Sequence, residues 1–82
     1  HRKAGNLIER AADVALTTGN VGQAANFYIT AAILLNRAGD GMSALTLIGK
    51  ARLLGTSPLL SPEERNAIRD RIIETQNTMA AS

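Results

Sequence analysis

Residues 24–38 read AANFYITAAILLNRA, and their clearly polar side chains are Asn26, Thr30, Asn36 and Arg37. A helix on the surface of a protein shows one apolar stripe, whereas this run is apolar around most of its circumference. It is also too short and too often interrupted by polar groups to span a bilayer, which takes about 20 apolar residues. We therefore predict a central helix that other parts of the chain cover on more than one side.

The composition is typical of closely packed helices. The 82 residues are enough for one domain with one modest core. Hydrophobic residues make up 45% of the chain but aromatic residues only 2%, so the core must consist mainly of Ala, Leu, Ile and Val. Such small side chains would fill a β-sandwich or a large ligand cavity poorly. Because the chain begins at His1 and not at Met, we expect a fragment of a larger protein.

Charge and residue counts narrow the possible chemistry. The formal net charge is +2, the chain has no cysteine, and His1 is its single histidine. A disulfide framework and a thiolate metal site are therefore excluded. Glu9 and Asp13 share a helix face, but we interpret them as solvated groups, with Arg10 and Asp13 as a local ion pair. We predict no catalytic residues, no metal, no cofactor and a cytoplasmic location.

Turn signals divide the chain into four predicted helices, at about 4–18, 21–38, 42–54 and 62–78, within a single all-α domain spanning residues 1–82. Gly19-Asn20 and Gly39-Asp40 each combine a helix stop with a cap for the next helix. Ser61-Pro62-Glu63-Glu64 is a capping box with proline at the first helical position. We expect residues 1–3 to be frayed or to continue from an absent segment, and residues 79–82 to be a frayed tail.

An internal repeat links the first three helices. At an offset of 20, Gly19-Asn20, Ala24, Tyr28 and Ala31 align with Gly39-Asp40, Ala44, Ile48 and Ala51. The shared pattern is G-[N/D]-x-x-x-A-x-x-x-[Y/I]-x-x-A. The glycine reverses the chain, the next residue caps, and the small residues let neighbouring helices approach. The central helix is therefore shared by two overlapping hairpins.

This pattern resembles the tetratricopeptide (TPR) family of helical repeats. One matching register across the second and third helices comprises Tyr28, Ala31-Ala32, Leu35, Gly39-Asp40, Ala44, Ile48 and Ala51. A second across the first two comprises Ile8, Ala11-Ala12, Ala15, Gly19-Asn20, Ala24, Tyr28 and Ala31. Together they cover residues 8 to about 54. The offset of 20 departs from the family period of 34, and the usual closing proline is replaced by Asn36 or Thr56, so the resemblance implies a TPR-like array of hairpins without standard repeats.

The resemblance also implies a binding groove beside the first two helices. In that family, polar residues on the concave face grip an extended peptide or a partner helix. The corresponding positions here, with flanking basic residues, are Asn6, Arg10, Asp13, Asn26, Thr30, Ile33, Arg37 and Lys50. The alternative is that Asn26 and Thr30 bond to each other or to backbone inside the bundle. We expect a non-catalytic adaptor or docking domain with a protein or peptide partner.

Three other functions remain open at this point. The stretches Ala11-Ala12, Thr18-Gly19-Asn20 and residues 23–28 resemble the MIT domain of membrane-trafficking proteins, which implies binding of short helical peptides. Nucleic-acid binding would use Lys50, Arg52, Arg65, Arg69 and Arg71, but these residues are interleaved with acids and have no aromatic side chain beside them to stack bases. A structural or self-associating segment would use Leu59-Leu60 as an exposed apolar contact.

Overall fold

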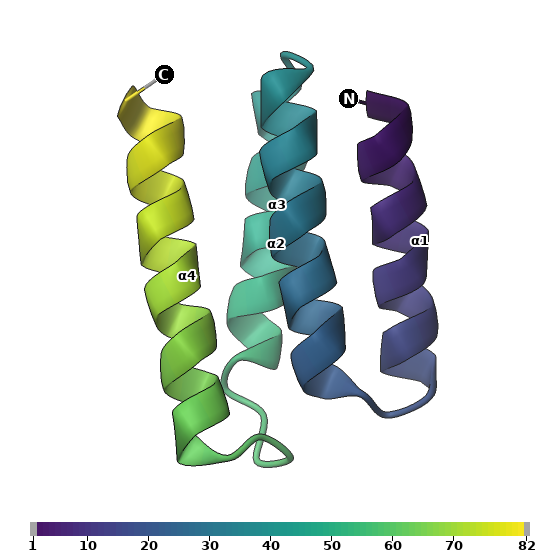
Figure 1. Ribbon diagram of the computed structural model, residues 1–82, viewed down its shortest axis with the longest axis vertical. Coiled ribbons are helices and arrows are strands. Elements are labelled where there is room, and N and C mark those ends of the chain that lie inside the picture. Colours follow the sequence, from purple (N-terminus) through teal and green to yellow (C-terminus); the bar gives the residue numbers. More distant parts are fainter. Residues whose placement is uncertain (1, 82) are drawn as a thin grey trace.

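The computed structural model describes residues 2–81, which form four helices. These are α1 (Arg2–Thr17), α2 (Val21–Arg37), α3 (Gly41–Leu54) and α4 (Pro62–Ala81). Successive helices run antiparallel, and α2 packs against all three others (Figure 1). The predicted all-α fold of four antiparallel helices is confirmed. Its relation to the TPR family stays a resemblance.

The helix boundaries follow the predicted turn chemistry. Asn20 Oδ1 and Asp40 Oδ1 accept hydrogen bonds from the backbone N–H groups of Gln23 and Ser43, both at 3.2 Å. The glycines before these caps have positive φ angles, +83° at Gly19 and +88° at Gly39. A residue with a Cβ adopts that conformation only at a cost, so both glycines are needed where the chain reverses.

The capping box at the start of α4 is also present. The Ser61 N–H donates to Glu64 Oε1 at 3.0 Å, and the Glu64 N–H donates back to Ser61 Oγ at 3.1 Å. Hydrogen bonds from the Ser43 side chain and backbone lower the pKa of Asp40, the cap of α3. The backbone N–H groups of Ser43, Ser61 and Glu64, which a helix end would otherwise leave free, are satisfied by these caps.

The core is built around α2 from small and branched side chains. Eight of its residues are buried: Val21, Ala24, Ala25, Tyr28, Ile29, Ala31, Ala32 and Leu35. Helix α1 meets α2 through Gly5, Ala12 and Ala15, and a Cβ on Gly5 would lie 3.0 Å from Leu35 Cγ. Small residues at this contact therefore let the two helices approach closely, as the repeat pattern predicted.

Both outer ends of the fold are more ordered than predicted. Helix α1 already begins at Arg2, whose guanidinium lies 3.4 Å from Asp40 Oδ2. Helix α4 continues to Ala81, and Met79 packs against the core. The prediction of frayed ends is therefore wrong for residues 2, 3 and 79–81, because an ion pair and an apolar contact outside the local sequence hold them. His1 and Ser82 lie outside the described residues.

The glycines give a matched test of this fold. A Cβ on Gly49, in the middle of α3, would meet no atom within 4 Å. We expect Gly49→Ala to raise the free energy of unfolding by about 0.5–1 kcal/mol, because alanine is the better helix former. Gly39→Ala should lower it by about 1–2 kcal/mol, because φ is positive there. Urea denaturation followed by circular dichroism measures both, and equal effects of the two changes would contradict this account.

Candidate functional site

The eight residues predicted to line a groove separate into four places. Asn6 and Arg10 lie on the outer side of α1. Asp13 and Lys50 lie on either side of Tyr28. Asn26 and Thr30 contact Arg71 of α4. Ile33 and Arg37 line a hollow between α2 and α4. The structure thus brings these residues together in pairs and does not align them along one groove, and their part in binding stays a prediction.

Asn26 and Thr30 hold α4 against α2. One Arg71 nitrogen, Nη1, donates to Asn26 O and to Asn26 Oδ1, both at 3.0 Å. The other, Nη2, donates to Thr30 Oγ1 at 2.9 Å. Thr30 in turn donates to Asn26 O at 3.1 Å. The planar guanidinium therefore binds two side chains that lie one turn apart on α2, a geometry that lysine cannot reproduce.

Tyr28 connects three helices. Its hydroxyl donates a hydrogen bond of 2.5 Å to Asp13 Oδ1 of α1. Lys50 of α3 places its ammonium 5.5 Å from the centre of the Tyr28 ring and 3.6 Å from Glu9 Oε2. Burial, together with the hydrogen bond to Asp13, raises the pKa of Tyr28 to about 12. The predicted ion pair between Arg10 and Asp13 is absent from the described residues, because Asp13 turns to Tyr28.

The remaining predicted residues line two open hollows. One, of about 340 Å³, includes Asn6 and Arg10 together with Arg2, Lys3 and Leu7. The other, of about 380 Å³, includes Ile33, Arg37 and Arg71. Arg37 is exposed, and Glu74 of α4 lines the same hollow. Neither hollow joins the first two helices into a continuous channel.

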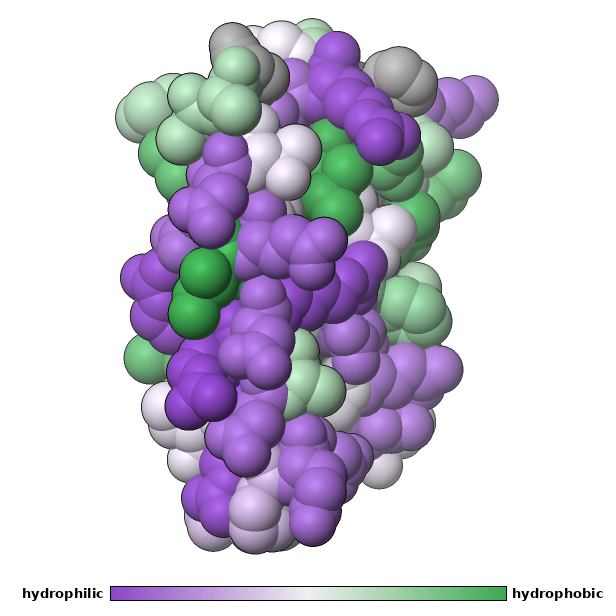
Figure 2. Space-filling model, turned by 60° about the vertical axis from the view of Figure 1, so that its left-hand side comes forward, coloured by the Kyte–Doolittle hydropathy of each residue, from purple (hydrophilic) through white to green (hydrophobic). Residues whose placement is uncertain are grey.

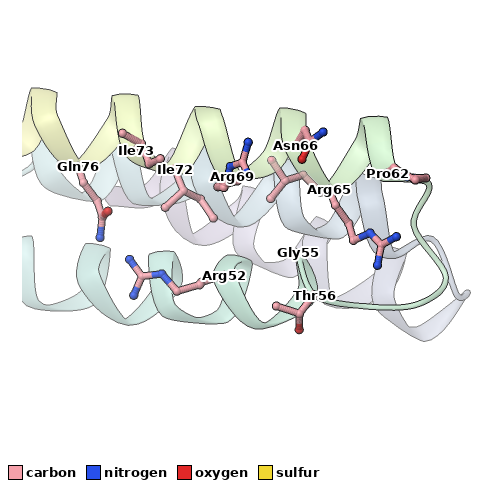
Figure 3. A pocket seen from close by; sticks show the side chains of 11 residues that line it. Arg52, Gly55, Thr56, Pro62, Arg65, Asn66, Arg69, Ile72, Ile73 and Gln76 are labelled. Carbon is pink, nitrogen blue, oxygen red and sulfur yellow. The ribbon is translucent and has the colours of Figure 1, made fainter.

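A larger groove, which sequence reasoning missed, lies between α3 and α4. It has a volume of about 560 Å³ and is lined by Arg52, Gly55, Thr56, Pro62, Arg65, Asn66, Ile68, Arg69, Ile72, Ile73 and Gln76. Arg52 and Gln76 extend toward each other from α3 and α4 across this space (Figure 3). Ile68 and Ile72 are buried at its base, whereas Ile73 is 50% exposed.

The charged side chains that line the α3–α4 groove are all basic. Three arginines and no carboxylate line the groove, as far as residues 2–81 are concerned. Asp70 and Glu74 line a neighbouring hollow that shares only Ile73 with the groove. Within the same described residues, Arg52 and Arg65 have no hydrogen-bond or ion-pair partner, and Arg69 pairs only with the adjacent Asp70, at 3.6 Å. The groove is therefore basic and has few internal partners for its charges.

A signal for this groove was present in the spacing of α4. Arg65, Arg69 and Ile73 follow one another at intervals of four and so share one side of a helix. Their partner on α3, Arg52, could not be assigned from the local pattern. The Leu59-Leu60 pair was predicted to be exposed as a unit, and this is wrong for Leu60. Leu59 is exposed, but Leu60 is only 5% exposed and belongs to the core.

Comparisons with known proteins add no relatives: no family model, curated protein or solved structure matches the chain. Within residues 2–81, no group of three or more His, Cys, Asp or Glu side chains is arranged to hold a metal ion. In the same range, no helix has the length and apolar character needed to cross a membrane. The function is therefore argued from the geometry of the groove.

The Arg71 contacts predict a stability effect. We expect Arg71→Ala to lower the free energy of unfolding by about 1–2 kcal/mol, because α4 loses its polar contacts with α2. Arg71→Lys should restore little of it, since an ammonium cannot bridge both sites. Arg69→Ala, in an exposed side chain of the same helix, is the control and should change the value by less than about 0.5 kcal/mol. Equal losses of unfolding free energy for Arg71→Ala and Arg69→Ala in urea denaturation would rule out a stabilising role of the Arg71 contacts.

The raised pKa of Tyr28 predicts that the stability of the fold decreases at high pH. Because its folded pKa of about 12 lies above the ordinary value of 10.0, neutral Tyr28 stabilises the fold fully below pH 10.0. That contribution should be lost as the pH rises from 10.0 to about 12. Ultraviolet titration of the tyrosinate should give a midpoint near 12 for the folded chain. Tyr28→Phe should remove the loss of stability in this window, and an unchanged pH profile would exclude Tyr28 as its origin.

Proposed function

We propose that this chain is a non-catalytic protein-interaction domain that docks a peptide or helix of a partner protein in the groove between α3 and α4. The observation that supports this function is the groove itself, an open space of about 560 Å³ with isoleucines at its base and along one wall. Concave sites that combine apolar floors with a few polar groups are the usual form of ligand and peptide sites.

This site differs from the one predicted beside the first two helices. There, Asn26 and Thr30 already accept hydrogen bonds from Arg71, and a ligand would have to compete with α4 for them. Asp13 is likewise engaged by Tyr28. The arginines of the α3–α4 groove have no such commitments among the described residues, apart from the exposed Arg69–Asp70 pair. A partner can therefore contact them without breaking contacts that hold the bundle together.

Two features of the surface fit a docking role. Figure 2 shows that the side of the molecule formed by α4 is mostly hydrophilic, with separate hydrophobic side chains among the polar ones. Ile73 is one exposed hydrophobic residue of α4, and it lies at the groove. An exposed apolar side chain beside polar groups is typical of interaction surfaces.

Selection of binders from a displayed library of random peptides tests the proposed function. We expect peptides selected on the wild-type chain to shift the amide resonances of residues lining the groove, with micromolar affinity, since the site is smaller than a standard interface. Ile73→Asp should weaken these peptides at least about tenfold, because it places a charge on the apolar wall. Leu7→Asp, at an exposed leucine on α1, is the matched control. Peptides that bind wild type and Ile73→Asp equally would contradict docking in this groove.

A further inference from the structure

The charges of the α3–α4 groove define the chemistry of its occupant. We infer that the groove takes an acidic amphipathic helix, with carboxylates facing Arg52, Arg65 and Arg69 and an apolar stripe on Ile72 and Ile73. This inference rests on the proposed docking function and specifies the class of partner. Its basis is the presence of three guanidinium groups in a groove without a lining carboxylate, in the part of the chain that the structure describes.

The arginines that line the groove come from both of its walls. Arg52 projects from α3, whereas Arg65 and Arg69 belong to α4 and are separated by one helical turn (Figure 3). Carboxylates on both edges of a bound helix can therefore be paired. Guanidinium groups bind carboxylates through two parallel hydrogen bonds, which makes arginine better suited than lysine to this contact.

The dimensions suit a short helix. From Arg65 to Gln76 the α4 wall rises about 16 Å, which equals three turns of a helix. On α3, Leu45 precedes Arg52 by seven residues, lies on the same side of the helix and is 56% exposed. Leu45 therefore offers one apolar contact beyond the lined part of the groove, within the length of a helix of about 10–15 residues.

Charge also determines what the groove rejects. A basic helix would place its ammonium or guanidinium groups against three arginines, and like charges at such contacts are unfavourable. Asp70 pairs with Arg69 at 3.6 Å and Glu74 lines the neighbouring hollow, so the repulsion falls mainly on Arg52 and Arg65. The three arginines of the groove therefore favour an acidic partner, and they contribute to specificity and to the rate of association more than to affinity.

Three synthetic amphipathic helices of about 15 residues test the inference. They share one stripe of leucines and carry glutamate, glutamine or lysine at all flanking positions. Binding to the whole chain is measured by fluorescence anisotropy. We expect the glutamate helix to bind about tenfold more tightly than the glutamine helix, given modest gains from each of three exposed ion pairs. The lysine helix should bind most weakly, and raising the salt from about 50 to 500 mM should remove most of the advantage of glutamate.

Variants locate the effect. In the triple variant Arg52→Gln, Arg65→Gln, Arg69→Gln, the glutamate helix should bind only as tightly as the glutamine helix does. The affinity of the glutamine helix itself should not change. Lys3→Gln removes a positive charge from an exposed position on α1 and should have an effect of less than about twofold. Circular dichroism checks that each variant remains folded.

The outcomes separate the two proposals. If the glutamine and glutamate helices bind equally well in the groove, the acidic specificity is wrong while the docking function stands. If no helix binds and the displayed library yields no groove binder, both are wrong. A single-stranded oligonucleotide of about 20 nucleotides that binds more tightly than the glutamate helix, and loses affinity in the triple variant, would assign the arginines to nucleic acid and overturn the inference.

Discussion

The close packing of α2 is the constraint on which the rest of the structure depends. One helix contacts three others, and it does so with alanines at positions 24, 25, 31 and 32, all of them fully buried. Small side chains allow short distances between helix axes, but each buries little apolar area. Branched residues such as Ile29 and Ile48 must therefore supply the bulk of the core. The fold thus combines close helix contacts with a few large side chains, which is why so short a chain manages without aromatic residues beyond Phe27 and Tyr28.

Polar contacts between helices complement this packing. Tyr28 binds Asp13, Lys50 reaches Glu9 across the tyrosine ring, and Arg71 binds Asn26 and Thr30. No buried side-chain polar atom is left without a hydrogen bond among the described residues. An alanine-rich interface is uniform and would tolerate sliding or rotation of one helix on another. Directional contacts at fixed positions oppose such movements, so they specify the arrangement more than they add to its stability.

The sequence predicts local features well and contacts between distant residues poorly. Helix ends were predictable because Asn20, Asp40 and Ser61 bond within three residues of themselves. The partner of Asn26 was not, since Arg71 lies 45 residues away. The same limit applies to the groove: Arg65 and Arg69 were visible as neighbours on one helix, but nothing in the local pattern placed Arg52 opposite them. The alternative prediction, that Asn26 and Thr30 bond to backbone, is confirmed, because Asn26 Nδ2 donates to Gly22 O and Thr30 Oγ1 donates to Asn26 O. Their further contact with Arg71 of α4 was not predicted.

Helix α4 contributes both to the core and to the groove, because its arginines make different contacts on different sides of the helix. Arg71 points to α2 and holds the helix in place, whereas Arg65 and Arg69 line the groove with α3. The helix has only a narrow apolar side, formed by Ile68, Ile72 and Met79, so its attachment depends strongly on those few contacts. A ligand bound between α3 and α4 would contact both and so add its binding free energy to that attachment. Conversely, a change that loosens α4 would reduce the binding free energy of the ligand by the same coupling free energy, because linkage is reciprocal. Binding in the proposed groove and attachment of α4 would therefore be coupled equilibria.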